Sequence, residues 1–228
     1  MTVRLSTRIS IRWDNDAPSE PTHTVVLSVG SHFMDLRIKK DDNSIDWAFA
    51  GTREIVSEVP LHCRWHHVID SRLSFDSDEG KFEKLPNGDD LETGSMPCAE
   101  KNNHITPYEE VWRQIHPTLR ADRGWILQAD SDGTTIFLGC FGGIFLAMKQ
   151  DASGVFSVRK EELQDVRGRL QWVMKYESGD GELPSLAATN LIEFVGEEQW
   201  KEGDEVVIAG DIYRVKELQT FRNRTSKL

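Results

Sequence analysis

Residues 169–177, RLQWVMKYE, alternate between apolar and polar side chains with a period of two. In an extended chain, one face would carry Leu170, Trp172, Met174 and Tyr176. Successive side chains of a β-strand point to opposite faces of a sheet, so this alternation is typical of a strand with one buried face. We therefore expect an antiparallel strand here, because antiparallel sheets commonly leave one face in water.

Much of the remaining chain also predicts strands separated by turns. Stretches such as HTVVLSVG, FMDLRIKK and IDWAFAG are short and apolar, and clusters rich in Asp, Asn, Gly and Ser lie between them. Gly210 and Asp211 lie between two apolar runs, as in the tight turn of a hairpin. These patterns predict a mainly β protein with few helices.

One helix is clearly indicated, in ITPYEEVWRQIHP at residues 105–117. Thr106 suits the N-cap, Pro107 suits the first helical position, and Glu109 completes a capping box. The helix would end before Pro117. A second, short helical turn is expected in GEEQWKEG at residues 196–203.

The segment from Thr118 to Gly124 follows the predicted helix and precedes a new series of strands. We place a domain boundary there. The prediction is an N-terminal β-rich domain of residues 1–118, ending in the short helix, and a C-terminal β-rich domain of residues 119–228.

Residues 62–67, HCRWHH, combine three histidines with a cysteine, which are residue types that bind zinc. A helical count from Leu61 fits several apolar positions, but strong helix formers are scarce and the apolar residues fall mainly at odd positions. On the strand that this favours, same-face neighbours lie about 7 Å apart, so four ligands could not converge on one ion. No CxxC or comparable motif would complete a site. We expect neither a metal nor a cofactor.

The odd-numbered face of this strand is the candidate ligand-binding surface. His67 lies there among apolar residues, and small-molecule sites are mostly apolar with a few polar groups. His67 would then orient a ligand, whereas the alternative is a core histidine hydrogen-bonded within the fold. The candidate pocket residues are Trp47, Phe49, Cys63, Trp65, His67 and Ile69.

The formal net charge of −11 argues against nucleic acid and anionic membranes as partners, because both attract proteins with a basic face. The longest apolar run, residues 136–148, is too short to span a bilayer. The first residues lack the apolar segment of a secretory signal, and three cysteines cannot all pair within one chain. We expect a cytoplasmic location, with the nucleus as an additional one.

The stretch IDWAFAGTREIVSE at residues 45–58 resembles a block of a fungal family named Hri-one. HHVIDSR, LETGSMP and YEEVWRQIHP continue the resemblance, and IFLGCFGGIFL, EEQWKEGDEV and YRVKE follow in the expected order. The resemblance covers nearly the whole chain. It implies two lipocalin-like antiparallel β-barrel domains packed together in an intracellular fungal protein, and it implies neither an established reaction nor catalytic residues.

Two classes of function remain open. The first is a lipocalin-like protein that binds a small apolar ligand or a protein partner without chemistry, since an eight-stranded barrel can hold one small ligand. The second is a cofactor-free isomerase, cyclase or dehydratase acting on a fungal secondary metabolite, since one His, Asp or Glu in a dry pocket can transfer protons. The chain contains no GxSxG, P-loop or GxGxxG motif, which disfavours the enzyme classes that depend on them.

Overall fold

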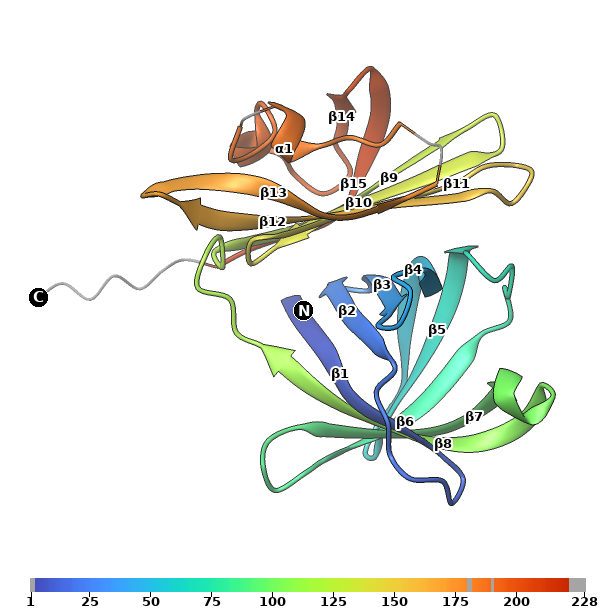
Figure 1. Ribbon diagram of the computed structural model, residues 1–228. Coiled ribbons are helices and arrows are strands. Elements are labelled where there is room, and N and C mark those ends of the chain that lie inside the picture. The colour runs from blue at the N-terminus through green and yellow to red at the C-terminus, as the bar shows by residue number, and fades with distance from the viewer. Residues whose placement is uncertain (1–2, 180–181, 190, 222–228) are drawn as a thin grey trace, which may run out of the picture. The chain divides into compact units, whose positions relative to one another are not determined.

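The computed structural model describes residues 3–179, 182–189 and 191–221, and β-strands form most of its regular structure (Figure 1). The prediction of a mainly β protein is confirmed. The first half of the chain forms a closed antiparallel barrel, and the second half forms a seven-stranded sheet in place of a second closed barrel.

The barrel consists of eight strands that pair in sequence order, and β8 closes it by pairing with β1. The strands are β1 (Val3–Trp13), β2 (Thr22–Val29), β3 (His32–Lys39), β4 (Ile45–Glu58), β5 (Leu61–Asp70), β6 (Asp78–Lys84), β7 (Asp90–Cys98) and β8 (His104–Ile115). A single 3-10 turn, η1 (Ala99–Lys101), joins β7 to β8. Closure leaves the barrel without unpaired edges, which are the usual liability of a sheet.

The helix predicted at residues 105–117 is wrong, because this segment is strand β8. Its residues Thr106, Tyr108, Glu110 and Trp112 are buried in alternation with less buried neighbours, which is the period of a strand. β8 pairs with β7 along nearly its whole length and with β1 on the other side. These long-range ladders outweigh the local capping signals of Thr106, Pro107 and Glu109.

The strand prediction for HCRWHH is confirmed, because these residues belong to β5. The register of β5 with β4 shifts between Ala50 and Gly51, so that Gly51 pairs with His67 while Ala50 pairs with Ile69. Directly paired residues share a face of the sheet, and the shift marks a β-bulge. Ile69 therefore lies on the opposite face from His67, although residues two positions apart in a regular strand share a face.

The second half of the chain forms a sheet in the order β13-β12-β11-β10-β9-β15-β14. Its strands are β9 (Arg123–Ser131), β10 (Thr134–Phe141), β11 (Ile144–Gln150), β12 (Phe156–Val166), β13 (Arg169–Ser178), β14 (Glu205–Ile208) and β15 (Asp211–Thr220). Gly142 and Gly143, both with positive φ, form the tight turn between β10 and β11.

One face of this sheet carries a large aromatic core. Trp125, Phe145 and Tyr213 from the sheet are each fully buried, and Phe194 and Trp200 from the segment after β13 pack with them. The same segment contains the short helices α1 (Leu186–Thr189) and η2 (Glu197–Gln199), and η2 is the helical turn predicted at residues 196–203. Of the two helical segments expected from the sequence, the one at residues 196–203 is therefore present, and the sequence does not predict α1.

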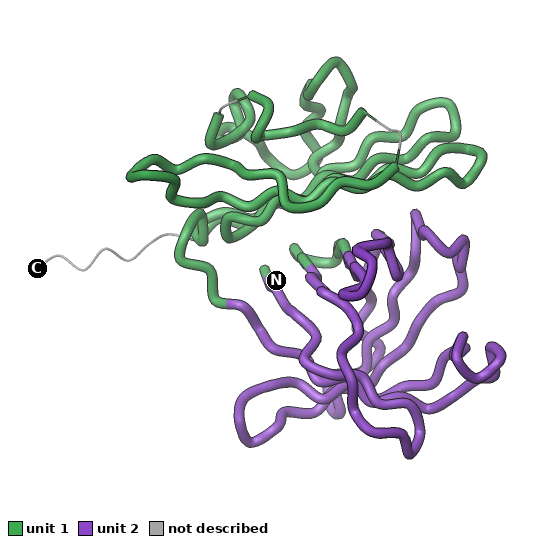
Figure 2. The backbone as a smooth tube through the Cα atoms, viewed as in Figure 1, with its two compact units in different colours: residues 1–3, 27–34, 116–228 green, residues 4–26, 35–115 purple. Residues whose placement is uncertain are grey.

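Two compact units divide the chain (Figure 2). One contains residues 4–26 and 35–115, which are most of the barrel, and the other contains residues 1–3, 27–34 and 116–228. The domain boundary predicted after residue 118 stays a prediction. Among the described residues, no helix is long and apolar enough to cross a membrane.

Candidate functional site

Charged side chains occupy the interior of the barrel. Arg37 on β3 contacts Glu110 and Trp112 on β8, although β1 and β2 lie between these strands in the sheet order. Such contacts must cross the space enclosed by the strands, which we call the lumen. The lumen is therefore lined by ion pairs in addition to apolar groups.

Arg37 is the centre of the lumen's ion network. Its guanidinium donates to both carboxylate oxygens of Asp35, at 2.8 Å from Nη2 to Oδ2, and to Glu110 at 3.3 Å. Its charge also lies over the ring of Trp47, 5.1 Å from the centroid, and over those of Phe49 and Trp112. This buried cation thus contacts two carboxylates and the faces of three aromatic rings.

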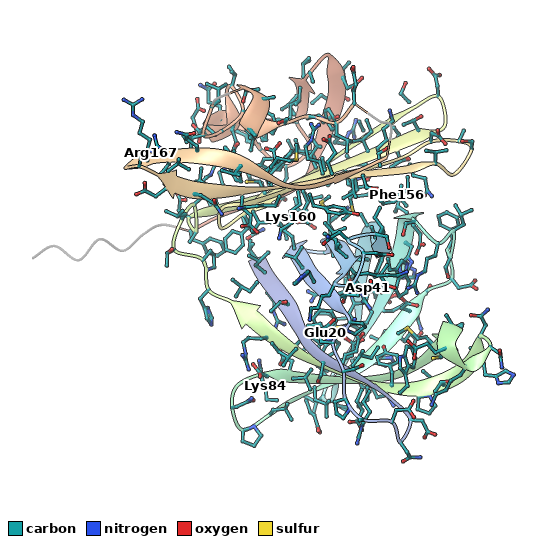
Figure 3. The ribbon with its side chains drawn as sticks, in the orientation of Figure 1. Glu20, Asp41, Lys84, Phe156, Lys160 and Arg167 are labelled. Carbon is teal, nitrogen blue, oxygen red and sulfur yellow. The ribbon has the colours of Figure 1, made fainter. Side chains whose placement is uncertain are left out.

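Arg8 extends the network toward one end of the barrel. It donates to Glu110 at 2.5 Å, to Thr22 at 3.0 Å and to Glu20 at 2.8 Å. Glu20, labelled in Figure 3, belongs to the segment between β1 and β2. This end of the lumen is therefore filled by bonded side chains.

Glu92 on β7 is a second buried carboxyl group of the lumen. Tyr108 Oη and Trp112 Nε1 donate to its two oxygens at 2.9 and 2.8 Å. Burial and the negative charge of Glu110 raise the pKa of Glu92 to about 8. Gly80 and Gly94 make room for these groups, because a Cβ at Gly80 would lie 2.3 Å from Glu92 Oε1 and one at Gly94 would lie 2.5 Å from Tyr108 Oη.

His67 is buried and held by acceptors on both ring nitrogens. Nδ1 lies 2.7 Å from Asp70 Oδ2 and 3.0 Å from the carbonyl of Ser74, and Nε2 lies 3.3 Å from Asp78 Oδ2. Burial alone would lower the pKa of His67, but the hydrogen bonds to Asp70 and Asp78 raise it to about 9. His67 is thus an imidazolium that ties the segment after β5 to the barrel.

The structure brings together three of the six predicted pocket residues. The His67 ring lies 4.3 Å from that of Phe49 and 5.8 Å from that of Trp47, whose Nε1 donates to Asp70 at 2.9 Å. Cys63 and Trp65 lie farther along the same face of β5, and the bulge turns Ile69 to the other face. Because acceptors within the chain occupy both nitrogens of His67, a ligand's hydrogen bond would come from another residue.

One stretch of the lumen wall is less covered than the rest. The register aligns Arg53 with Trp65, Leu61 with Phe82, and Phe82 with Glu92, so these side chains share the lumen face. Arg53, Leu61, Trp65 and Phe82 are nevertheless only partly buried, whereas Cys63 between them is 1% exposed. We call these four residues the barrel mouth. They provide a lumen-facing surface that solvent reaches.

The ion network was not found from the sequence. Asp35 and Arg37 alternate with Met34, Leu36 and Ile38, and such alternation normally indicates a strand with one solvent-exposed face. In the barrel both faces of β3 are buried. This strand is buried on both faces because the barrel closes. A local sequence pattern does not indicate closure.

Metal binding has no further support in the described part of the chain. Within residues 3–179, 182–189 and 191–221, no three His, Cys, Asp or Glu side chains are grouped so that they could hold an ion. Burial raises the pKa of the Cys63 thiol, which disfavours the thiolate that a metal would need. The absence of a metal stays a prediction.

Comparison with known proteins assigns the chain to a family. The model of the family described as Protein HRI1 matches residues 4–217. The chain belongs to the HRI1 family. This confirms the resemblance to Hri-one that the sequence motifs indicate.

A solved structure shows the same fold. The crystal structure of the uncharacterized protein YLR301w from Saccharomyces cerevisiae superposes with a TM-score of 0.75 at 15% sequence identity. The match covers 96% of this chain and 100% of the yeast chain. A search of curated proteins found no match.

We predict that His67 makes the stability of the barrel depend on pH. Because its pKa is raised from 6.5 to about 9, its contribution is complete below about pH 6.5 and is lost as the pH rises through 9. His67→Gln should therefore lose roughly 1–3 kcal/mol of unfolding free energy at pH 6 and much less at pH 9.5. The measurement is urea unfolding of both proteins at the two pH values.

The matched control for this prediction is His66→Gln, because the His66 side chain is exposed. Its effect should stay within about 0.5 kcal/mol at either pH. Each variant is compared with the wild type at the same pH. The contribution of Glu92, whose pKa of about 8 lies in this range, is common to both proteins and cancels. An equal loss for His67→Gln at pH 6 and pH 9.5 would contradict the assignment of an imidazolium.

Proposed function

We propose that this HRI1 family member is a binding protein whose barrel takes a small molecule with an apolar body at the barrel mouth. The carrying observation is the contrast between the two parts of the lumen. The part around Arg8 and Arg37 is filled by bonded, buried side chains, whereas Leu61, Trp65 and Phe82 face the lumen and keep exposed apolar surface.

The chemistry of the mouth supports apolar recognition. The rings of Trp65 and Phe82 meet edge to face, with centroids 5.8 Å apart. Large aromatic side chains dominate the energetics of binding surfaces, and partly exposed ones inside a barrel can cover a ligand with little loss of side-chain freedom.

The test uses N-phenyl-1-naphthylamine, a neutral apolar fluorophore. We expect its emission to rise on binding to the wild-type protein, and we expect Trp65→Ala to weaken the affinity about tenfold or more. Trp13→Ala is the matched control, since Trp13 is also partly buried but lies on β1, which pairs with β2 and β8 and not with the strands of the mouth. Its affinity should stay within about twofold of wild type.

Two results would contradict the proposal. One is a wild-type protein that does not bind the fluorophore at all. The other is a Trp65→Ala variant that keeps its circular dichroism spectrum and binds as tightly as the wild type.

A further inference from the structure

Arg53 is a cation of the lumen face that the ion network does not include. It pairs with Trp65 across β4 and β5, which places its side chain on the face that also carries Cys63 and Phe82. Among the described residues, Arg53 forms no ion pair, and its Nε is buried without a hydrogen-bond partner. Arg8 and Arg37, by contrast, each bind two carboxylates.

The carboxylates of the lumen are engaged by other groups. Asp35 and Glu110 bind Arg37, and Glu92 accepts from Tyr108 and Trp112. Asp90, at the start of β7, pairs with Arg4 and Lys84. A buried guanidinium nitrogen without an acceptor is unfavourable, so its position is better explained by an acceptor that comes from outside the chain.

The apolar groups near Arg53 indicate what kind of molecule would carry that acceptor. A guanidinium presents a planar set of donors that fits the oxygens of a carboxylate or a sulfonate. Trp65 pairs with Arg53 across the sheet, and the Trp65 ring meets the Phe82 ring with centroids 5.8 Å apart. Both aromatic side chains are apolar and partly exposed. The Arg53 guanidinium next to an apolar surface is therefore complementary to a molecule that carries one acidic group on an apolar body.

The net charge of the protein adds to the argument. At −11 the chain as a whole repels anions, so an anion would bind only where a specific cation lies next to apolar surface. Arg64, the neighbouring cation on β5, does not offer this, because it pairs with Glu79 and Glu54. Arg53 thus combines a guanidinium without an ion pair among the described residues and neighbouring apolar surface, whereas Arg64 is already paired.

We infer that the ligand of the barrel mouth is a small organic anion, with its carboxylate or sulfonate on Arg53 and its apolar body against Trp65 and Phe82. This inference rests on the proposed function and adds the charge of the ligand to it. It makes Arg53 the residue that distinguishes an acid from its neutral analogue.

The test compares two probes that differ in one group. 1-Anilinonaphthalene-8-sulfonate is N-phenyl-1-naphthylamine with an added sulfonate, so both present the same apolar body. In the wild type, we expect the sulfonate to bind more tightly than the neutral probe. Arg53→Met keeps an apolar stem and should weaken binding of the sulfonate about tenfold to hundredfold, the range for a hydrogen bond to a charged group.

The controls separate charge from packing. Arg53→Met should weaken binding of the sulfonate much more than binding of the neutral probe, and Arg64→Met should leave the affinity for both probes within about twofold. Arg53→Gln provides a second variant if Arg53→Met does not fold, and it should show the same selective loss for the sulfonate. Circular dichroism spectra verify the fold of each variant.

The outcomes distinguish the two proposals. The inference of an anionic ligand is wrong if the neutral probe binds at the mouth but the sulfonate binds no more tightly. It is also wrong if Arg53→Met weakens the binding of both probes equally. In either case the proposed binding function stands. If neither probe binds to the wild type, both proposals fail.

Discussion

Replacing Arg37 with methionine should lower the free energy of unfolding by about 3–5 kcal/mol, because it leaves buried carboxylates without their cation. Asp35 would lose its guanidinium partner, and Glu110 would keep only Arg8. Burial already raises the pKa of Asp35, and Arg37 opposes that rise. Urea unfolding monitored by circular dichroism measures the effect.

A surface ion pair provides the control for Arg37→Met. Arg214 Nη2 lies 3.0 Å from Glu205 Oε1, and the two side chains are 61% and 60% exposed. Arg214→Met should therefore cost no more than about 1 kcal/mol. The double variant Arg37→Met/Asp35→Leu should recover part of the loss, because it removes a stranded charge together with its partner. Equal losses for Arg37→Met and Arg214→Met would show that the network contributes nothing beyond a surface pair.

Trp47→Ala should cost about 3–5 kcal/mol, the range for removing a large aromatic side chain from a core. Trp47 is 5% exposed, and its ring lies 4.4 Å from that of Phe49. Its Nε1 donates to Asp70, and the guanidinium groups of Arg37 and Arg72 lie over its ring. The substitution removes all of these contacts and opens a cavity beside the lumen.

Phe75→Ala is the matched control for Trp47→Ala. Phe75 is 54% exposed, so its truncation should change the free energy of unfolding by no more than about 0.5 kcal/mol. Chemical unfolding of the three proteins at one pH provides the comparison. A Trp47→Ala variant as stable as Phe75→Ala would mean that Trp47 does not pack in the core, and the description of the lumen would then be wrong.

The sequence predicts the strands well and the enclosure of the barrel poorly. The alternation in residues 62–67 is a local property of the chain, and it places β5 correctly. The capping signals at Thr106 and Pro107 are also local, but residues distant in sequence decide the outcome, since β8 must pair with both β1 and β7. Barrel closure is a long-range event that overrides a short helix.

The candidate site shows the same limit. The rings of Trp47, Phe49 and His67 pack together, but Ile69 does not join them because a β-bulge places it on the opposite face of β5. Asp35 and Arg37 alternate with apolar residues just as solvent-exposed residues do. Alternation reveals that two faces differ, but it does not reveal that the charged face is enclosed.

The most direct measurement of where a ligand binds is fluorine NMR of the protein labelled with 5-fluorotryptophan. The chain contains seven tryptophans, and Trp65→Phe identifies the signal of Trp65. Addition of N-phenyl-1-naphthylamine should shift the Trp65 signal and leave those of Trp125, Trp172 and Trp200, in the core of the second sheet, in place. An unchanged Trp65 signal together with a shift of one of those three would contradict binding at the barrel mouth.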